Sequence, residues 1–162
     1  MRCQPLRRAL CFFGGIVEDI RGNLEAYNKQ DFAIEHLNLA LSLYVKNEKM
    51  ASVIHLAGAA EEMLGKIVSL NNQEDAKEAL YRQMRVWWQK ILVTDTPPNK
   101  DLDKTVLNAK NTVKHINDKG DLTVELDLKK QARALLDRAI ENYHKIPGLS
   151  NTAEMREYYR NK

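Results

Sequence analysis

The sequence is poor in the residues that build turns. Only seven glycines and four prolines occur among its 162 residues, which is too few for the frequent tight turns of an all-β domain. It has just two cysteines, Cys3 and Cys11, both near the N-terminus. A disulfide framework would spread its cysteines through the domain, and a metal site would need a second pair of ligands. We therefore expect two ordinary thiols in a reducing, cytoplasmic compartment.

Long apolar runs and a strong excess of charge are also missing. No apolar run approaches the length of a membrane span, so we expect no membrane partner. Arg7 and Arg8 precede an apolar stretch, as in a signal peptide, but that stretch is too short and acidic residues soon follow it. We expect residues 1–15 to be an N-terminal tail. The net charge of +3 does not by itself indicate nucleic-acid binding, which needs basic residues gathered on one surface.

What the sequence does contain is helical periodicity. Apolar residues recur three and four positions apart over about 16–27, 31–46, 48–70, 71–93, 101–118 and 127–145. This pattern predicts an all-α fold, an up-and-down bundle of four principal helices with a shorter N-terminal helix. The bundle would form one domain over residues 16–149. Residues 150–162 would be a charged C-terminal tail or a terminal helix.

The segment 48–70 is the longest and most apolar of these helices. Residues 57–60 read Ala-Gly-Ala-Ala, which leaves room for a neighbouring helix to approach closely, so we place this helix at the centre of the bundle. Glu61 continues its apolar stripe, and a carboxylate in that position needs a partner. The partner could belong to a structural ion pair, or it could be a Lys or His of the 101–118 helix and contribute to a site.

The segment 71–93 carries adjacent tryptophans, Trp87 and Trp88. Two neighbouring residues of a helix cannot both face the same core, so this helix should contact two neighbours, or a core and a partner subunit. Arg82, Arg85 and Lys90 accompany the tryptophans but spread around the helix. They therefore give only a weak indication of a nucleic-acid surface.

The segment 101–118 carries the most chemically useful pattern. If it is one helix, its apolar residues line a single buried face. Four polar residues follow one flank at positions i, i+4, i+7 and i+11, and they are Lys104, Asn108, Asn111 and His115. Lys110 and Lys114 fall on the opposite flank. An imidazole beside amides and an ammonium group can move protons and hold a phosphate. The alternative is a solvated helix flank that carries one histidine.

Residues 110–115 read Lys-Asn-Thr-Val-Lys-His, which resembles the Arg-Asn-x-x-x-His signature of HEPN domains (higher eukaryotes and prokaryotes nucleotide-binding). The resemblance covers roughly residues 31–146, because the surrounding helices also match a small all-α bundle of this kind. Lys110 stands where the family usually has Arg, and an ammonium group lacks the planar fork that binds phosphate directionally. A looser match, Arg138 with His144, lacks the polar residue after the Arg and is set aside.

For an active member, the resemblance implies metal-independent RNA cleavage by internal attack of the 2′-hydroxyl. His115 would act as general base or acid, Asn111 would orient it, and Lys110 would stabilise the charge on the phosphate. Further binding residues would be Lys104, Asn108, Lys114 and Glu61. Lys110 and His115 lie about 140° apart on one helix. A shared site would therefore be easier to build across a two-fold interface, in line with the family habit of dimerising.

Two functions follow from the resemblance. The first is a dimerising module without catalysis that binds a nucleotide, a nucleic acid or a protein. The second is a toxin-like ribonuclease that uses His115. No cofactor or metal ion is implied. The expected partners are a second copy of the chain, a nucleotide or RNA, and a protein such as an antitoxin or a nucleotidyltransferase. Small helical bundles also share such patterns by convergence, which leaves a helical protein of other function as a third interpretation.

Overall fold

The computed structural model describes residues 25–92, 98–115 and 122–162, and its regular structure there is entirely helical. This confirms the predicted all-α class. The described helices are α2 (Lys29–Val45), α3 (Met50–Leu70), α4 (Ala76–Leu92), α5 (Asn99–Thr112), α6 (Leu128–His144) and α7 (Ala153–Arg160). None of them is long and apolar enough to cross a membrane. The two cysteines and residues 16–24 of the N-terminal helix predicted over 16–27 lie outside the described residues, and residues 25–27 are not helical.

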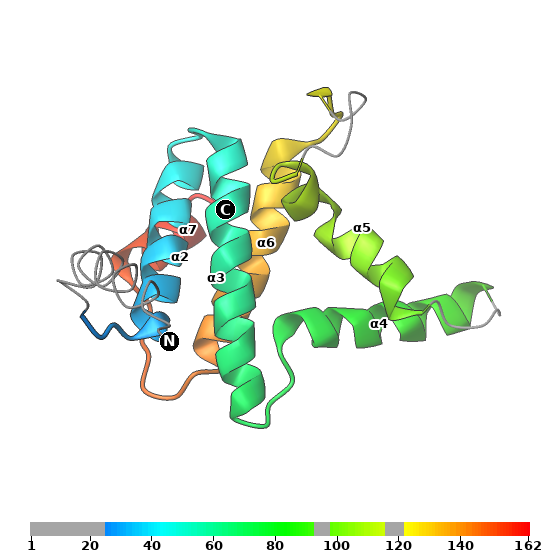
Figure 1. Ribbon diagram of the computed structural model, residues 1–162, viewed down its shortest axis with the longest axis horizontal. Coiled ribbons are helices and arrows are strands. Elements are labelled where there is room, and N and C mark those ends of the chain that lie inside the picture. Colours follow the sequence, from blue (N-terminus) through cyan, green and yellow to red (C-terminus); the bar gives the residue numbers. More distant parts are fainter. Residues whose placement is uncertain (1–24, 93–97, 116–121) are drawn as a thin grey trace, which may run out of the picture.

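The centre of the molecule is α3, which packs against α2 and α6 (Figure 1). Its apolar stripe is completely buried at Val53, Ile54, Ala57, Leu64 and Val68. The alanines of α2 and α6 that face it, Ala33, Ala40, Ala132 and Ala139, are also fully buried. These small side chains let the three helices approach closely. The prediction that the 48–70 helix is central is thus confirmed.

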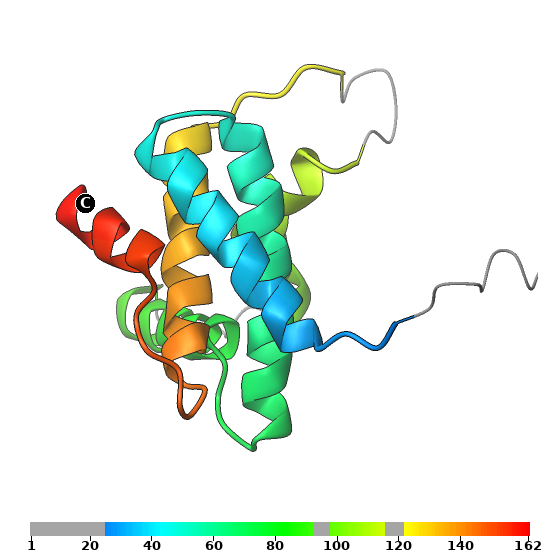
Figure 2. The same cartoon turned by 90° about the vertical axis from the view of Figure 1, so that its left-hand side faces the viewer.

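The C-terminal residues form α7, which belongs to the same core. Met155 and Tyr158 are fully buried there, and the Tyr158 hydroxyl donates a 2.8 Å hydrogen bond to Asp137 on α6. Thr152 caps the start of this helix, because its side chain accepts a hydrogen bond from the Met155 amide. Figure 2 shows α7 crossing beside α2 and α6. Of the two alternatives for residues 150–162, the structure has the terminal helix.

Two helices, α4 and α5, lie on the other side of α3 and α6. The N-terminal part of α4 packs on α6 and α5 packs on α3, while the rest of α4 extends away from the bundle (Figure 1). Only Ala76 and Tyr81 of α4 are buried among the described residues, and the Tyr81 hydroxyl donates a hydrogen bond to Asp103 of α5. Trp87 is 55% exposed and Trp88 is half-buried. The two tryptophans therefore have different surroundings, as expected for neighbouring residues of a helix.

One predicted boundary is wrong in a way that concerns the site. The helix predicted over 101–118 begins at Asn99 and already ends at Thr112. Val113 caps it, and the chain leaves the helix before His115. The apolar spacing of Val113 suggested a longer helix, but Val113 packs on the core from the capping turn instead. The histidine of the predicted polar stripe is therefore not on the helix.

Candidate functional site

A cluster of charged side chains connects α3, α5 and α6, and Lys110 is the residue that α5 contributes. The Lys110 side chain lies across α3 at Gly58, where an added Cβ would come within 2.6 Å of the lysine Cδ. Its Nζ donates a hydrogen bond to Glu62 Oε2 at 3.0 Å and lies 4.0 Å from Glu61 Oε2. Only 16% of the Lys110 side chain is exposed. The missing side chain at Gly58 thus allows the lysine to reach both carboxylates.

Glu61 is the buried centre of this cluster, with 4% of its side chain exposed. Its second oxygen, Oε1, accepts a hydrogen bond of 3.4 Å from Arg138 Nε on α6. Arg138 is itself largely buried, and its Nη2 has no hydrogen-bond partner among the described residues. A buried carboxylate needs compensating charge, and here α5 and α6 each supply one cation.

Asn142 holds the same region together from α6. It is 1% exposed, accepts a 2.7 Å hydrogen bond from the Ala76 amide and donates one of 3.1 Å to the Glu61 carbonyl oxygen. The Ala76 amide belongs to the first turn of α4, where backbone donors lack partners inside the helix. Asn142 therefore connects α6 to the start of α4 and to the α3 backbone beside the charged cluster.

The cluster has no excess charge, because two carboxylates face one ammonium and one guanidinium group. The hydrogen bond from Lys110 lowers the pKa of Glu62 below its ordinary value, and the positive charge of the lysine adds to this effect. A hollow of about 410 Å³ opens beside the cluster. The charged residues that line it are Glu61, Glu62, Asp75, Lys66, Lys77 and Lys110. Acidic and basic groups are balanced there, so the hollow does not favour an anion.

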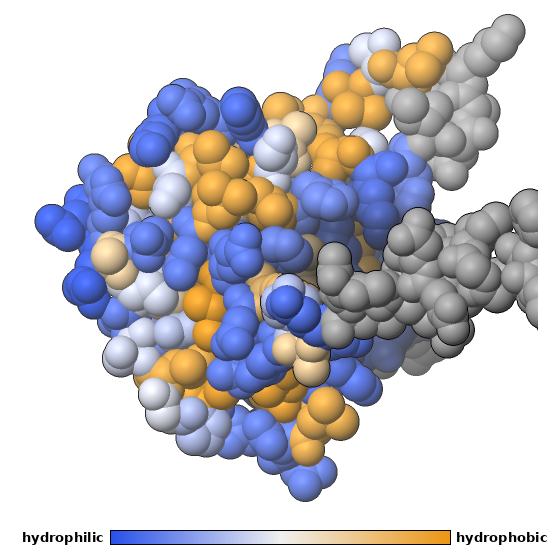
Figure 3. Space-filling model, turned by 60° about the vertical axis from the view of Figure 1, so that its left-hand side comes forward, coloured by the Kyte–Doolittle hydropathy of each residue, from blue (hydrophilic) through white to orange (hydrophobic). Residues whose placement is uncertain are grey.

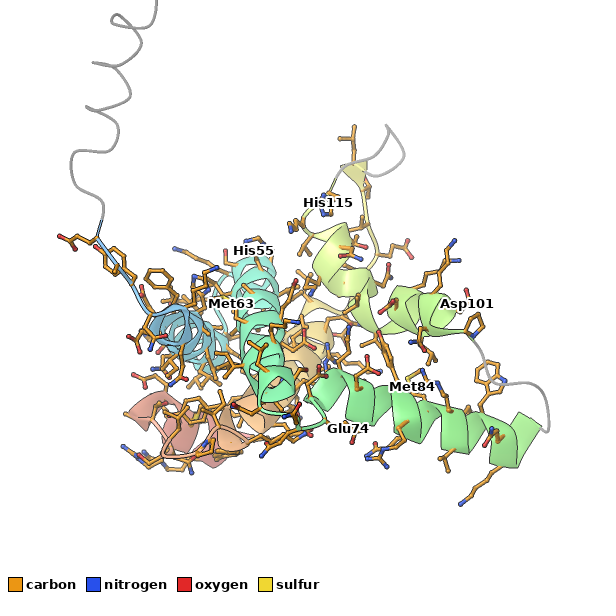
Figure 4. The ribbon with its side chains drawn as sticks, turned by 60° about the horizontal axis from the view of Figure 1, so that its bottom comes forward. His55, Met63, Glu74, Met84, Asp101 and His115 are labelled. Carbon is orange, nitrogen blue, oxygen red and sulfur yellow. The ribbon has the colours of Figure 1, made fainter. Side chains whose placement is uncertain are left out.

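The predicted catalytic residues do not meet in one chain. His115 and Asn111 are both exposed, and Figure 4 shows His115 beyond the end of α5, at the edge of the molecule. No hydrogen bond or ion pair within the described residues joins His115 to Lys110. Instead, Lys110 pairs with the acidic residues of α3. Of the alternatives left open for Glu61, a structural ion pair and a lysine of this helix both occur, because Arg138 of α6 lies 3.4 Å and Lys110 lies 4.0 Å from its carboxylate oxygens.

The remaining predicted binding residues lie on the solvent side of α5. Lys104 is exposed and forms an ion pair with Asp101 within its own helix, at 3.5 Å. Asn108 accepts a 3.3 Å hydrogen bond from the Thr112 hydroxyl, and Lys114 is exposed in the turn after the helix. These side chains form a solvated flank, and Glu61 is the one predicted binding residue that joins Lys110 in the buried cluster.

Sequence reasoning missed Arg138 and Asn142. The sequence pattern pairs Arg138 with His144, and the structure separates the two: Arg138 binds Glu61, whereas the exposed His144 ring lies 2.6 Å from Asn151 Oδ1. Asn142 could have been found, because it follows Leu135 and Ala139 on the apolar stripe of α6. A polar residue at such a core position requires a buried partner.

No protein-family model, curated protein or solved structure matches this chain. The resemblance to HEPN domains therefore stays a prediction from residues 110–115 and the helical pattern around them.

Proposed function

We propose that the protein is a cytoplasmic, non-catalytic binding module of HEPN type that dimerises and recognises another protein through α4. The observation that carries the proposal is the exposed apolar surface of α4. Val86 and Trp87 are 44% and 55% exposed on a helix that is attached to the bundle mainly by its first turns. Exposed tryptophans of this kind are typical of protein interfaces, where their large surface becomes buried.

The arrangement of the charged cluster argues against a ribonuclease. A catalytic cation must be free to stabilise the negative charge that develops on the phosphate. Lys110 is instead held by Glu61 and Glu62, so its charge is already balanced. His115 would have to act from an exposed position beyond the helix, without a contact to that lysine. These contacts therefore favour binding over catalysis.

The basic residues of α4 argue for a protein rather than a nucleic acid as its partner. Arg82 donates two hydrogen bonds to Glu74, at 3.0 and 2.9 Å, and Arg85 donates one to Asn99. Phosphates would therefore have to compete with partners that both guanidinium groups already have. Burying the apolar surface of Val86 and Trp87 is favourable, and the Trp87 indole N–H can find a hydrogen-bond acceptor on a protein, so a protein surface is the better match for α4.

Catalysis is tested by incubating the purified protein with single-stranded RNA in EDTA, beside the His115→Ala variant. We expect neither protein to cleave the RNA at any dose. Cleavage by the wild type that His115→Ala abolishes would overturn the proposal and establish the metal-independent ribonuclease instead. Cleavage that survives in the variant would indicate a contaminating nuclease, and the preparation would be repeated.

Recognition through α4 is tested by photo-crosslinking from a benzoylphenylalanine placed at Gln83, an exposed position one turn before Trp87. We expect a specific crosslinked protein in cells, and its loss when Trp87→Ser is added. The matched control is Tyr27→Ser, which removes an aromatic side chain that is 63% exposed near the start of the described chain, outside α4. Equal crosslinking in both variants would show that α4 is not the recognition surface.

A further inference from the structure

A second apolar surface lies on the solvent side of α3, next to the start of α2. It forms a groove of about 590 Å³, lined by Lys29, Ala59, Glu62, Met63, Lys66, Ile67 and Leu70. Leu70 is 70% exposed, and Phe32 and Leu39 on neighbouring α2 are also exposed. Figure 3 shows patches of apolar surface on this side of the molecule, interrupted by hydrophilic residues. The groove is distinct from the α4 surface and from the hollow beside the charged cluster, although Glu62 and Lys66 line both the groove and that hollow.

Two charges of opposite sign border this groove, and their positions are self-complementary. Glu62 and Lys66 lie four residues apart on α3, so they lie along the same edge of the groove. If two copies of α3 pack antiparallel through this groove, about a two-fold axis that crosses it midway between positions 62 and 66, the axis exchanges these two positions. Glu62 of each copy then faces Lys66 of the other, and two equivalent ion pairs form.

The same register also matches side-chain size. Leu70 and Ala59 lie near the middle of the groove side of α3, and the midpoint of their positions falls within half a residue of the same axis. The large exposed leucine of each copy would therefore lie over the small alanine of the other. Met63 and Ile67 lie between these contacts and would pack around the axis. Charge and size thus select one arrangement of two α3 helices.

From this complementarity we infer that the groove on α3 is occupied by a second copy of this chain, in an antiparallel α3–α3 dimer. The inference rests on the proposed function and names the surface through which the module dimerises. A partner of different sequence would need its own matching pattern of charge, whereas a second copy supplies Lys66 opposite Glu62 by symmetry. Both side chains are exposed, but Glu62 also accepts a hydrogen bond from Lys110, so its reversal acts on the charged cluster as well, and the reversal of Lys66 is the cleaner of the two.

The experiment uses two charge reversals of the full chain, Glu62→Lys and Lys66→Glu, in sedimentation velocity at about 5–200 µM. The wild type should be a dimer. In a dimer of either single variant, positions 62 and 66 carry charges of the same sign in both contacts between the copies. The dimer dissociation constant of each variant should therefore rise about tenfold or more. When the two variants are mixed, positions 62 and 66 again carry opposite charges in both contacts between the copies, and a heterodimer of wild-type affinity should form.

Controls separate a lost dimer from a lost fold. Each variant should keep its far-UV circular dichroism, and Glu48→Lys, a reversal at an exposed position away from the groove, should dimerise like the wild type. A monomeric wild type would overturn the inference, and so would a dimer that neither reversal weakens or a mixture that does not recover. A dimer that neither reversal weakens overturns the α3 surface alone and leaves a dimerising module in place, whereas a monomeric wild type also overturns the dimerisation in the proposed function. The crosslinking assay decides recognition through α4 in either case.

Discussion

The charged cluster makes its sharpest prediction at two neighbouring glutamates of α3. Glu61 and Glu62 both interact with Lys110, but only 4% of the Glu61 side chain is exposed, against 74% of Glu62. Changing either residue to Gln removes one negative charge and leaves the side-chain shape nearly unchanged. The pair therefore separates the effect of burial from the effect of charge.

Glu61→Gln should cost about 3 kcal/mol or more of the free energy of unfolding. Removing one member of a buried ion pair typically costs about 3–5 kcal/mol, because the remaining charge stays buried without compensation. Here the remaining charge is Arg138, which has 11% of its side chain exposed and an Nη2 already without a partner among the described residues. Glu62→Gln should cost less than about 1 kcal/mol, since the Glu62 carboxylate is exposed to water and Lys110 keeps Glu61 as a second partner.

Urea unfolding followed by far-UV circular dichroism at pH 7 measures both changes. The transition midpoint should fall clearly for Glu61→Gln and little for Glu62→Gln, with similar slopes. A double-mutant cycle with Lys110→Met then assigns the coupling of the lysine to each glutamate. Equal costs for the two glutamates, within about 0.5 kcal/mol, would refute the idea that Glu61 is the buried centre of the cluster.

Three further predictions concern acid, the C-terminal helix and alkali. The pKa of Glu62 is lowered in the folded protein from its ordinary 4.5. The contribution of Glu62 to stability is therefore present above pH 4.5 and is lost as the pH falls further. In thermal unfolding at acidic pH, the melting temperature should fall less steeply with pH for Glu62→Gln than for the wild type. Met155→Ala should lower the free energy of unfolding in urea by about 2–5 kcal/mol, because Met155 is fully buried. Tyr159→Ala, at an exposed position, should lower it by less than about 1 kcal/mol. Similar losses for the two variants would show that α7 is not part of the core. Burial raises the pKa of Tyr81 above its ordinary 10.0. The neutral phenol therefore stabilises the fold below pH 10.0, and this contribution is lost as the pH rises. The melting temperature of Tyr81→Phe should fall less in alkali than that of the wild type, and an equal fall would contradict this role of Tyr81.

The helices of the bundle could be predicted because each depends on a local apolar pattern. In α3 and α6 the residues three and four apart are also those that become buried, so periodicity and packing agree. The starts of α6 and α7 have side-chain caps at Asp127 and Thr152, and the predicted start of the 127–145 helix coincides with the first of them. Neither the α4 extension nor the place of α7 in the core follows from one segment alone, since both depend on which helices pack together.

The end of α5 shows where the sequence carries too little information. No glycine or proline lies between Thr112 and Gly120 to mark a helix end, and the apolar residues there continue the helical spacing. The helix nevertheless ends at Thr112, and this removes His115 from the stripe on which the catalytic hypothesis depended. Arg138 escaped notice for a related reason, because its partner Glu61 is 77 residues away in the chain.

The two adjacent glutamates of α3 also explain how a surface contact can reach the buried cluster. Neighbouring residues of a helix point about 100° apart, so Glu61 faces the interior and Glu62 faces solvent, while Lys110 lies between them and contacts both. In the proposed dimer, Lys66 of the second copy approaches Glu62. The Glu62 carboxylate then interacts with two ammonium groups, those of Lys110 and of Lys66 from the second copy, so its interaction with Lys110 becomes weaker. Glu61 keeps its bond to Arg138 in either state, so dimerisation acts on the lysine and leaves the buried pair intact.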